Sequence, residues 1–142
     1  MKKLLTALTT ALLVVILAVT MTGCGKAGAI KSAYEKEGYT VATATVKDNE
    51  QAKGALKALG LSDDEVKEAE NWEVITASKG ISIAVVLKFP SSGDLKNFLT
   101  VEKDDGSKDT AMYDKAVEDG NVNSECLLLL GAGTAKDIFK NA

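Results

Sequence analysis

An apolar run near the amino terminus limits how much of this 142-residue chain can belong to a folded domain. Lys2 and Lys3 give the chain a positive start, and residues 4–19 are apolar except for three threonines. A positive start followed by an apolar stretch is the physical pattern of a secretory signal peptide. The sequence therefore predicts an exported protein whose residues 1–23 are removed, leaving enough chain for one small domain.

The end of this leader reads Met21-Thr22-Gly23-Cys24 and resembles the lipobox of bacterial lipoproteins. Gly23 fits the small residue that precedes the invariant cysteine of that family, whereas Met21 stands where leucine is usual. The resemblance covers residues 1–24 only. It implies signal cleavage between Gly23 and Cys24, a diacylglyceryl thioether on Cys24, and a fatty acyl chain such as palmitate on the new amino terminus. The alternative is an uncleaved transmembrane helix over residues 4–23, since about 20 apolar residues can span a bilayer.

A lipid anchor would place the protein on the outer face of the cytoplasmic membrane. Each buried methylene stabilises membrane binding by roughly 0.8 kcal/mol, so two or more acyl chains give stable anchoring. Residues 24–27 are then the lipidated amino terminus with a short tether, and residues 28–142 are the domain. Lysine without any arginine in the sequence hints at a Gram-positive source.

The charged residues exclude several kinds of site. The chain contains no arginine and no histidine, and its formal net charge is −3. Without guanidinium groups it cannot bind phosphate in the bidentate manner, and an acidic chain is unsuited to nucleic acid. Histidine is also absent as a general base or zinc ligand, and lipid on Cys24 would leave Cys126 as the one free thiol. We therefore expect no metal, no cofactor and no catalytic set, and an inert, buried Cys126.

Hydrophobic periodicity predicts an α+β fold in a single small domain. Alternating or continuous apolar stretches indicate strands, and apolar residues at helical spacing between glycines indicate helices. Ser62 and Glu65 have the spacing of a capping box. The order of the main elements, β-α-β-β-α-β, is that of the ferredoxin-like motif, with a four-stranded antiparallel or mixed sheet. The expected strands are 39–46, 73–78, 81–89 and 126–130.

Gly131, Gly133 and Thr134 join an expected strand to an expected helix. Backbone N–H groups at such a junction can surround an anion, which is one interpretation of the pattern. The third glycine of a dinucleotide-binding motif and the lysine of a P-loop are both missing. The favoured interpretation is a tight turn, with Thr134 as the N-cap of the last helix.

Asp119, Asn121, Asn123 and Glu125 alternate in a way that is similar to the start of a calcium-binding loop. The glycine expected at the sixth position of such a loop is a serine here, and the glutamate expected at its end is a leucine. The favoured interpretation is a polar connection rich in turn-forming residues.

Trp72 and Tyr39 are the aromatic residues that could contribute to a binding site. Trp72 lies between an expected helix and an expected strand, where its ring could line a groove for a partner or a sugar. Packing of both rings in the core is the simpler interpretation.

These observations favour a membrane-anchored lipoprotein that is a non-enzymatic binding or interaction module for an unknown protein or small ligand. An accessory subunit of a transporter or cell-envelope complex is a second interpretation. A small hydrolase that uses carboxylates alone is a third, and it requires two acids facing each other across a cleft.

Overall fold

The computed structural model describes residues 25–58 and 60–142. The leader, its predicted cleavage site at Gly23 and the predicted lipidation site at Cys24 all lie outside the described residues. Within the described part, no helix has the length and apolar character needed to cross a bilayer.

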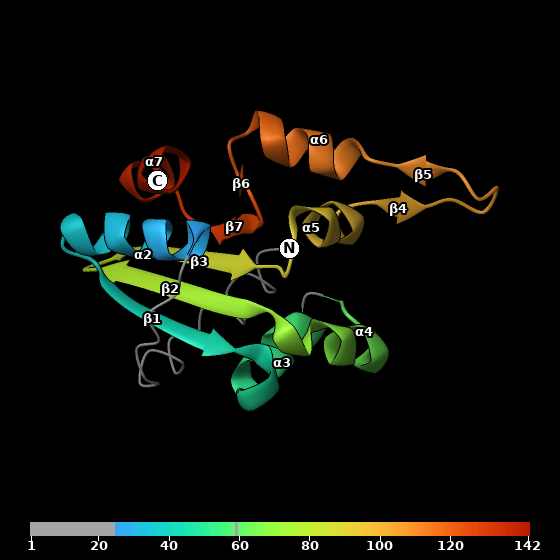
Figure 1. Ribbon diagram of the computed structural model, residues 1–142, viewed down its shortest axis with the longest axis horizontal. Helices are drawn as coiled ribbons and strands as arrows, with labels where there is room; N and C mark the ends of the chain where they lie inside the picture. Colours follow the sequence, from blue (N-terminus) through green and yellow to red (C-terminus); the bar gives the residue numbers. More distant parts are fainter. Residues whose placement is uncertain (1–24, 59) are drawn as a thin grey trace.

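The central element is an antiparallel sheet of five strands in the order β1-β2-β3-β7-β6. Figure 1 shows the long hairpin of β2 and β3 in its middle, and each of the four strands expected from the sequence is one of its strands. The α+β fold class is thus confirmed. The strands are β1 (Thr40–Thr45), β2 (Glu73–Lys79), β3 (Ser82–Lys88), β6 (Val122–Asn123) and β7 (Cys126–Leu130).

The four-stranded, ferredoxin-like arrangement is not confirmed. In a βαβ unit the two strands are parallel and a helix crosses between them. Here β1 pairs directly with β2 in the antiparallel sense, with Ala42 opposite Thr76. The four predicted strands pair in the order in which they occur in the chain: β1 with β2, β2 with β3, and β3 with β7. The short strand β6 pairs with β7 and adds a fifth strand at the edge of the sheet. The element order was predicted, but it leaves the pairing of the strands open.

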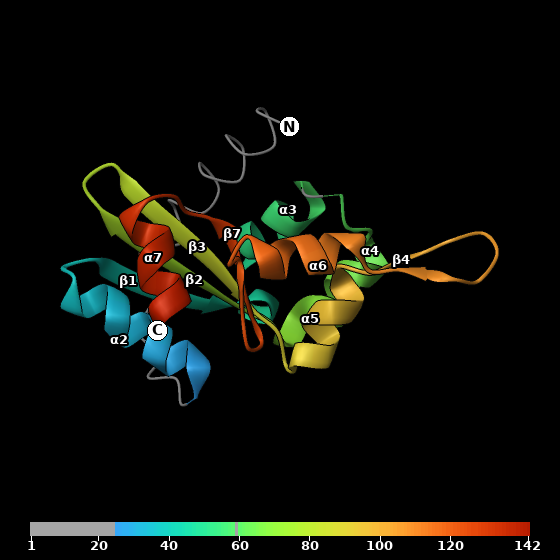
Figure 2. The same ribbon diagram turned by 90° about the horizontal axis from the view of Figure 1, so that it is seen from above.

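Two helices, α2 (Lys26–Lys36) and α7 (Thr134–Asn141), cover one face of the sheet. They lie side by side in Figures 1 and 2, although they come from opposite ends of the described chain. The hydroxyl of Tyr34 on α2 donates a hydrogen bond of 2.7 Å to the Ala135 carbonyl on α7. We call this the α2/α7 core; it also contains Ile30, Ile75, Val86, Cys126, Leu128 and Phe139.

A second core forms on the opposite face of the sheet. Successive side chains of β2 and β3 point to opposite faces, so every second residue of these strands belongs to this second core. In Figure 2 the helices that contribute to it gather at the other end of the molecule from α2 and α7. Val85, Leu87 and Phe89 belong to this second core, together with Leu95 from α5. Its helical elements are η2 (Val46–Asp48), α3 (Glu50–Ala58), α4 (Asp63–Glu68), η3 (Ala69–Asn71), α5 (Ser92–Phe98) and α6 (Ala111–Glu118).

A narrow arm extends from the second group of helices. The strands β4 (Val101–Glu102) and β5 (Lys108–Asp109) pair in a separate two-stranded sheet and extend away from the body in Figure 1. The sequence of residues 103–109 is polar and gives no sign of strand pairing. Gly106, with φ of 80°, lies in the exposed turn that connects the two strands. Asp105 accepts hydrogen bonds from Ser107 beside it, which stabilises this turn.

Three local predictions have clear outcomes. The capping box is confirmed, because Ser62 Oγ accepts from Glu65 N while Ser62 N donates to the Glu65 carboxylate. Ile81, expected in strand 81–89, lies instead in the hairpin turn, where it is fully exposed next to Gly80 with φ of 61°. The prediction that Thr134 caps the last helix is wrong. Gly133 is the N-cap, and Thr134 is the first helical residue.

Two buried threonine hydroxyls, one on each face of the sheet, have no hydrogen-bond partner among the described residues. Thr43 lies opposite Ile75 and shares the face of the α2/α7 core. Thr76 lies opposite Val85 and shares the face of the second core. Each hydroxyl lost water on folding without gaining a protein partner, which costs stability.

Candidate binding site

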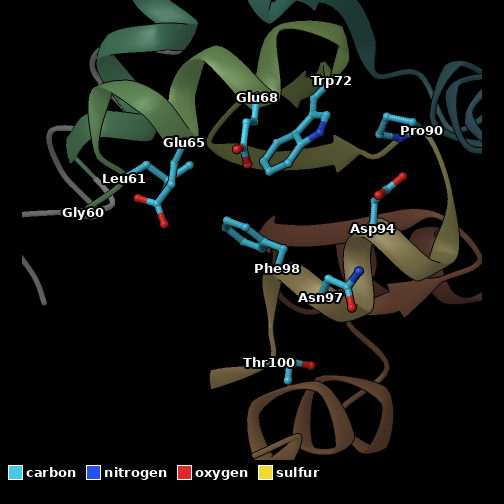
Figure 3. A pocket seen from close by; sticks show the side chains of 10 residues that line it. All are labelled: Gly60, Leu61, Glu65, Glu68, Trp72, Pro90, Asp94, Asn97, Phe98 and Thr100. Atoms are coloured by element: carbon cyan, nitrogen blue, oxygen red, sulfur yellow. The ribbon is translucent and has the colours of Figure 1, made fainter. Parts of the chain in front are cut away.

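A cleft of about 510 Å³ opens between α4 and α5, at the edge of the second core. Its volume is within the range of small-molecule sites. One wall is formed by the α4–η3 segment and Trp72, which follows it; the other wall is α5. Figure 3 shows Trp72 and Glu68 pointing from the first wall toward Phe98 on the second.

An aromatic cluster of Trp72, Phe89 and Phe98 forms the apolar part of the cleft. The Trp72 ring centre lies 4.4 Å from that of Phe89 and 5.3 Å from that of Phe98. Phe89 is buried beneath, with 1% of its surface exposed, whereas Trp72 and Phe98 are only partly buried. The cluster therefore presents two ring surfaces to the cleft and holds them on a rigid, buried third ring.

Local sequence explains why these rings meet. The 3₁₀ turn η3 ends at Trp72, whose backbone is already extended and enters β2 directly. Pro90 follows Phe89 and ends the strand β3, after which Ser91 caps α5 by accepting a hydrogen bond from Asp94 N. Phe98 then lies in the last turn of α5. The ends of two adjacent strands thus bring the three rings together.

Three carboxylates surround the aromatic rings, and two of them are already engaged. Glu65 accepts a hydrogen bond of 2.7 Å from Ser62 N, and this bond holds the pKa of Glu65 below its usual value. Asp94 accepts a bond of 2.7 Å from Ser91 Oγ. The side-chain carboxylate of Glu68 has no hydrogen bond or ion pair with any other described residue. Glu68 is therefore the lining carboxylate that is available to a ligand.

The lining of the cleft contains no lysine. Its other polar groups are neutral and include the amide of Asn97 and the hydroxyl of Thr100. The indole N–H of Trp72 donates to no group in the part of the chain that the structure describes. The cleft thus combines two aromatic surfaces, one free donor and a negative rim.

Tyr39, the second aromatic candidate from the sequence, does not reach this cleft. It is buried in the α2/α7 core, where its ring meets that of Tyr34 edge-on at 5.3 Å. Its hydroxyl lies 2.8 Å from Ser82 Oγ. Trp72 and Tyr39 therefore belong to different cores and do not form one site.

Gly131, Gly133 and Thr134 form the turn between β7 and α7. A Cβ atom on Gly131 would lie 3.1 Å from a Leu128 methyl group, and Gly133 has φ of 57°. Both glycines are thus explained by close packing and by a left-handed backbone. The anion-binding interpretation stays a prediction.

Three of the four residues of the calcium interpretation have side chains that are engaged with other partners. Asp119 ends α6 and pairs with Lys115 at 2.7 Å. Asn123 Nδ2 donates to the Phe139 carbonyl at 2.8 Å, so it ties β6 to α7. Glu125 is hydrogen-bonded to Ser124. Among the described residues, no group of three or more acidic or thiol side chains is placed to hold a metal ion.

Cys126 is completely buried, in agreement with its predicted position in a core strand. Burial raises the pKa of its thiol to about 12, and the neighbouring Glu125 charge adds to the rise. Because the thiolate is the reactive form, this side chain is inert at neutral pH.

Sequence reasoning identified Trp72 but missed its partners Phe98 and Glu68. Helical spacing predicts that Phe98 lies on the inner face of its helix, and the run of acids from Asp63 to Glu68 predicts that Glu68 is solvent-exposed. Neither assignment could show that α4 and α5 face each other, because no local pattern relates two helices that lie on either side of a β-hairpin. The one available signal was a Trp immediately after a short acidic helix.

No family model, curated protein or solved structure matches this chain.

Proposed function

We propose that the protein is a lipid-anchored binding module on the outer face of a bacterial cytoplasmic membrane, and that the cleft between α4 and α5 takes up its ligand. The leader and the sequence around Cys24 support the anchor. The observation that carries the binding role is the pair of partly exposed rings, Trp72 and Phe98, which contact each other edge-on and line the cleft.

The rigidity of the site supports binding as well. Trp72 and Phe98 both rest on the buried Phe89, so little side-chain freedom is lost when a ligand enters. Ordering of mobile side chains is one of the main costs of association. A preorganised aromatic cleft reduces that cost.

The carboxylate-hydrolase alternative gains no support from this geometry. Such an enzyme needs a carboxylic acid with a raised pKa to protonate the leaving group. The three lining carboxylates are exposed to solvent, and the pKa of Glu65 is lowered by its bonds to Ser62. We therefore prefer binding over hydrolysis.

The two cysteines of the chain allow a matched test of the anchor. Cells making the wild type, Cys24→Ala or Cys126→Ala are grown with a clickable palmitate analogue. We expect the wild type and Cys126→Ala to carry the label and to partition into the detergent phase, because Cys126 is buried. Cys24→Ala should lose both properties. Undiminished labelling of Cys24→Ala would show that the anchor is elsewhere or absent.

A further inference from the structure

We infer that the cleft recognises an organic cation: a primary or quaternary ammonium group. This inference rests on the proposed binding role of the cleft and names the chemical class of the ligand. Two aromatic ring surfaces, one free carboxylate and the absence of any lining lysine occur together at one opening.

The ring surfaces supply the first part of the argument. The face of an aromatic ring carries negative charge density, and tryptophan attracts cations most strongly. Trp72 and Phe98 stand nearly at right angles, with 85° between their planes. A compact cation in the corner between them would contact one ring by its face and the second ring by its edge or face. Two walls meeting at this angle suit a rounded ammonium group better than a flat ring.

The charges supply the second part. Glu68 points toward the same opening as the indole of Trp72 in Figure 3, and no described residue neutralises it. Glu65 and Asp94 add negative charge at the rim even though each accepts a hydrogen bond. An anion placed here would meet three carboxylates and no lysine. The electrostatic field in the cleft therefore favours binding of a cation and disfavours binding of phosphate, carboxylates and acidic peptides.

Lysines close to the cleft residues in the sequence do not line the cleft, and this includes Lys67, which directly precedes Glu68. Lys57 is paired with Asp63 at 2.8 Å, and Lys96 lies over the Tyr113 ring with its nitrogen 5.4 Å from the ring centre. Neither lines the cleft. The second contact also shows, within the same molecule, an aromatic face that receives an ammonium group.

Trp72 is the only tryptophan of the chain, so its fluorescence reports on the cleft directly. The full lipidated protein in non-ionic detergent is titrated with choline and with cadaverine. The matched neutral probe is 3,3-dimethyl-1-butanol, in which carbon replaces the quaternary nitrogen of choline. We expect a saturable change with both cations, weaker binding as salt is raised, and at least tenfold weaker binding of the neutral isostere.

Two variants test which groups are responsible. Glu68→Gln should weaken choline binding about fivefold, the effect of one unit charge at about 4 Å in a water-like medium. The matched control is Glu118→Gln, because Glu118 is an exposed acid of α6 outside the cleft. Phe98→Leu should weaken binding of choline but leave that of the neutral isostere unchanged. Circular dichroism checks that each variant is folded.

Each other outcome contradicts the inference. Equal affinity for choline and its neutral isostere, or equal losses in Glu68→Gln and Glu118→Gln, would show that the cleft does not select positive charge. Glucose, N-acetylglucosamine or phosphate binding where the cations do not would overturn the cation class while leaving a functional cleft. No response of Trp72 to any probe would remove both the cation and the binding role of this cleft. The anchor is tested separately by palmitate labelling.

Discussion

The two cores of this molecule share one sheet but differ in how completely they close. In the α2/α7 core the aromatic rings of Tyr34 and Phe139 are fully buried, and the Tyr34 hydroxyl is bonded to a backbone carbonyl. In the second core Phe89 is buried, but Trp72 and Phe98 stay partly exposed at a cleft. The comparison teaches that similar apolar patterns can produce a closed core on one face of a sheet and a core with an open cleft on the other.

The largest expected difference between the two cores is the cost of removing a ring. Phe139→Ala should lower the free energy of unfolding by about 3–5 kcal/mol, because it leaves a cavity in the α2/α7 core. Phe98→Ala should cost about 1–2 kcal/mol, since its ring already contacts solvent. Urea unfolding of both variants measures the difference. Equal losses would show that the second core is as closed as the first.

Part of this contrast could be predicted from the sequence. The apolar strand 126–130 with its buried Cys126 was predicted correctly, because burial of a strand on both sides leaves a continuous apolar run in the sequence. The cleft could not be predicted. It depends on the angle at which α5 leaves the sheet after Pro90, and only the packed structure sets that angle. Strand order was missed for a related reason: local patterns show where strands are but not which strands pair.

Alkaline pH should affect the α2/α7 core through Cys126. The unfolded thiol loses its proton near pH 9, whereas burial in the folded state raises its pKa to about 12. Above pH 9 the unfolded state therefore binds fewer protons, so stability falls as pH rises toward 12. One such group contributes at most about 1.4 kcal/mol per pH unit. Thermal melts from pH 8 to 11 should show a shallower decline for Cys126→Ala than for the wild type.

Tyr34 also makes the folded state less stable as pH rises, because burial raises the pKa of its hydroxyl as well. Its contribution begins near pH 10 and is present in both proteins, so it cancels in the comparison. Identical slopes for the wild type and Cys126→Ala would mean that the thiol becomes accessible in the folded state.

The smallest expected effect compares the two unpartnered threonines, one on each face of the sheet. Thr43→Val and Thr76→Val each replace a buried hydroxyl by a methyl group of similar shape. Each should raise the free energy of unfolding by about 1 kcal/mol, because the unpaired polar group is removed. Chemical denaturation measures both. A gain for Thr43→Val with a loss for Thr76→Val would show that water reaches the second face, sharpening the contrast between the cores.

The arm of β4 and β5 bears on how this chain can vary in length. Its turn at residues 103–107 is exposed and takes no part in either core. The entropy of closing a loop rises only slowly as residues are added. Insertions here would therefore change the reach of the molecule without disturbing the packing that holds it together. Relatives of this chain should differ most in size at this point, and an epitope placed there should be tolerated.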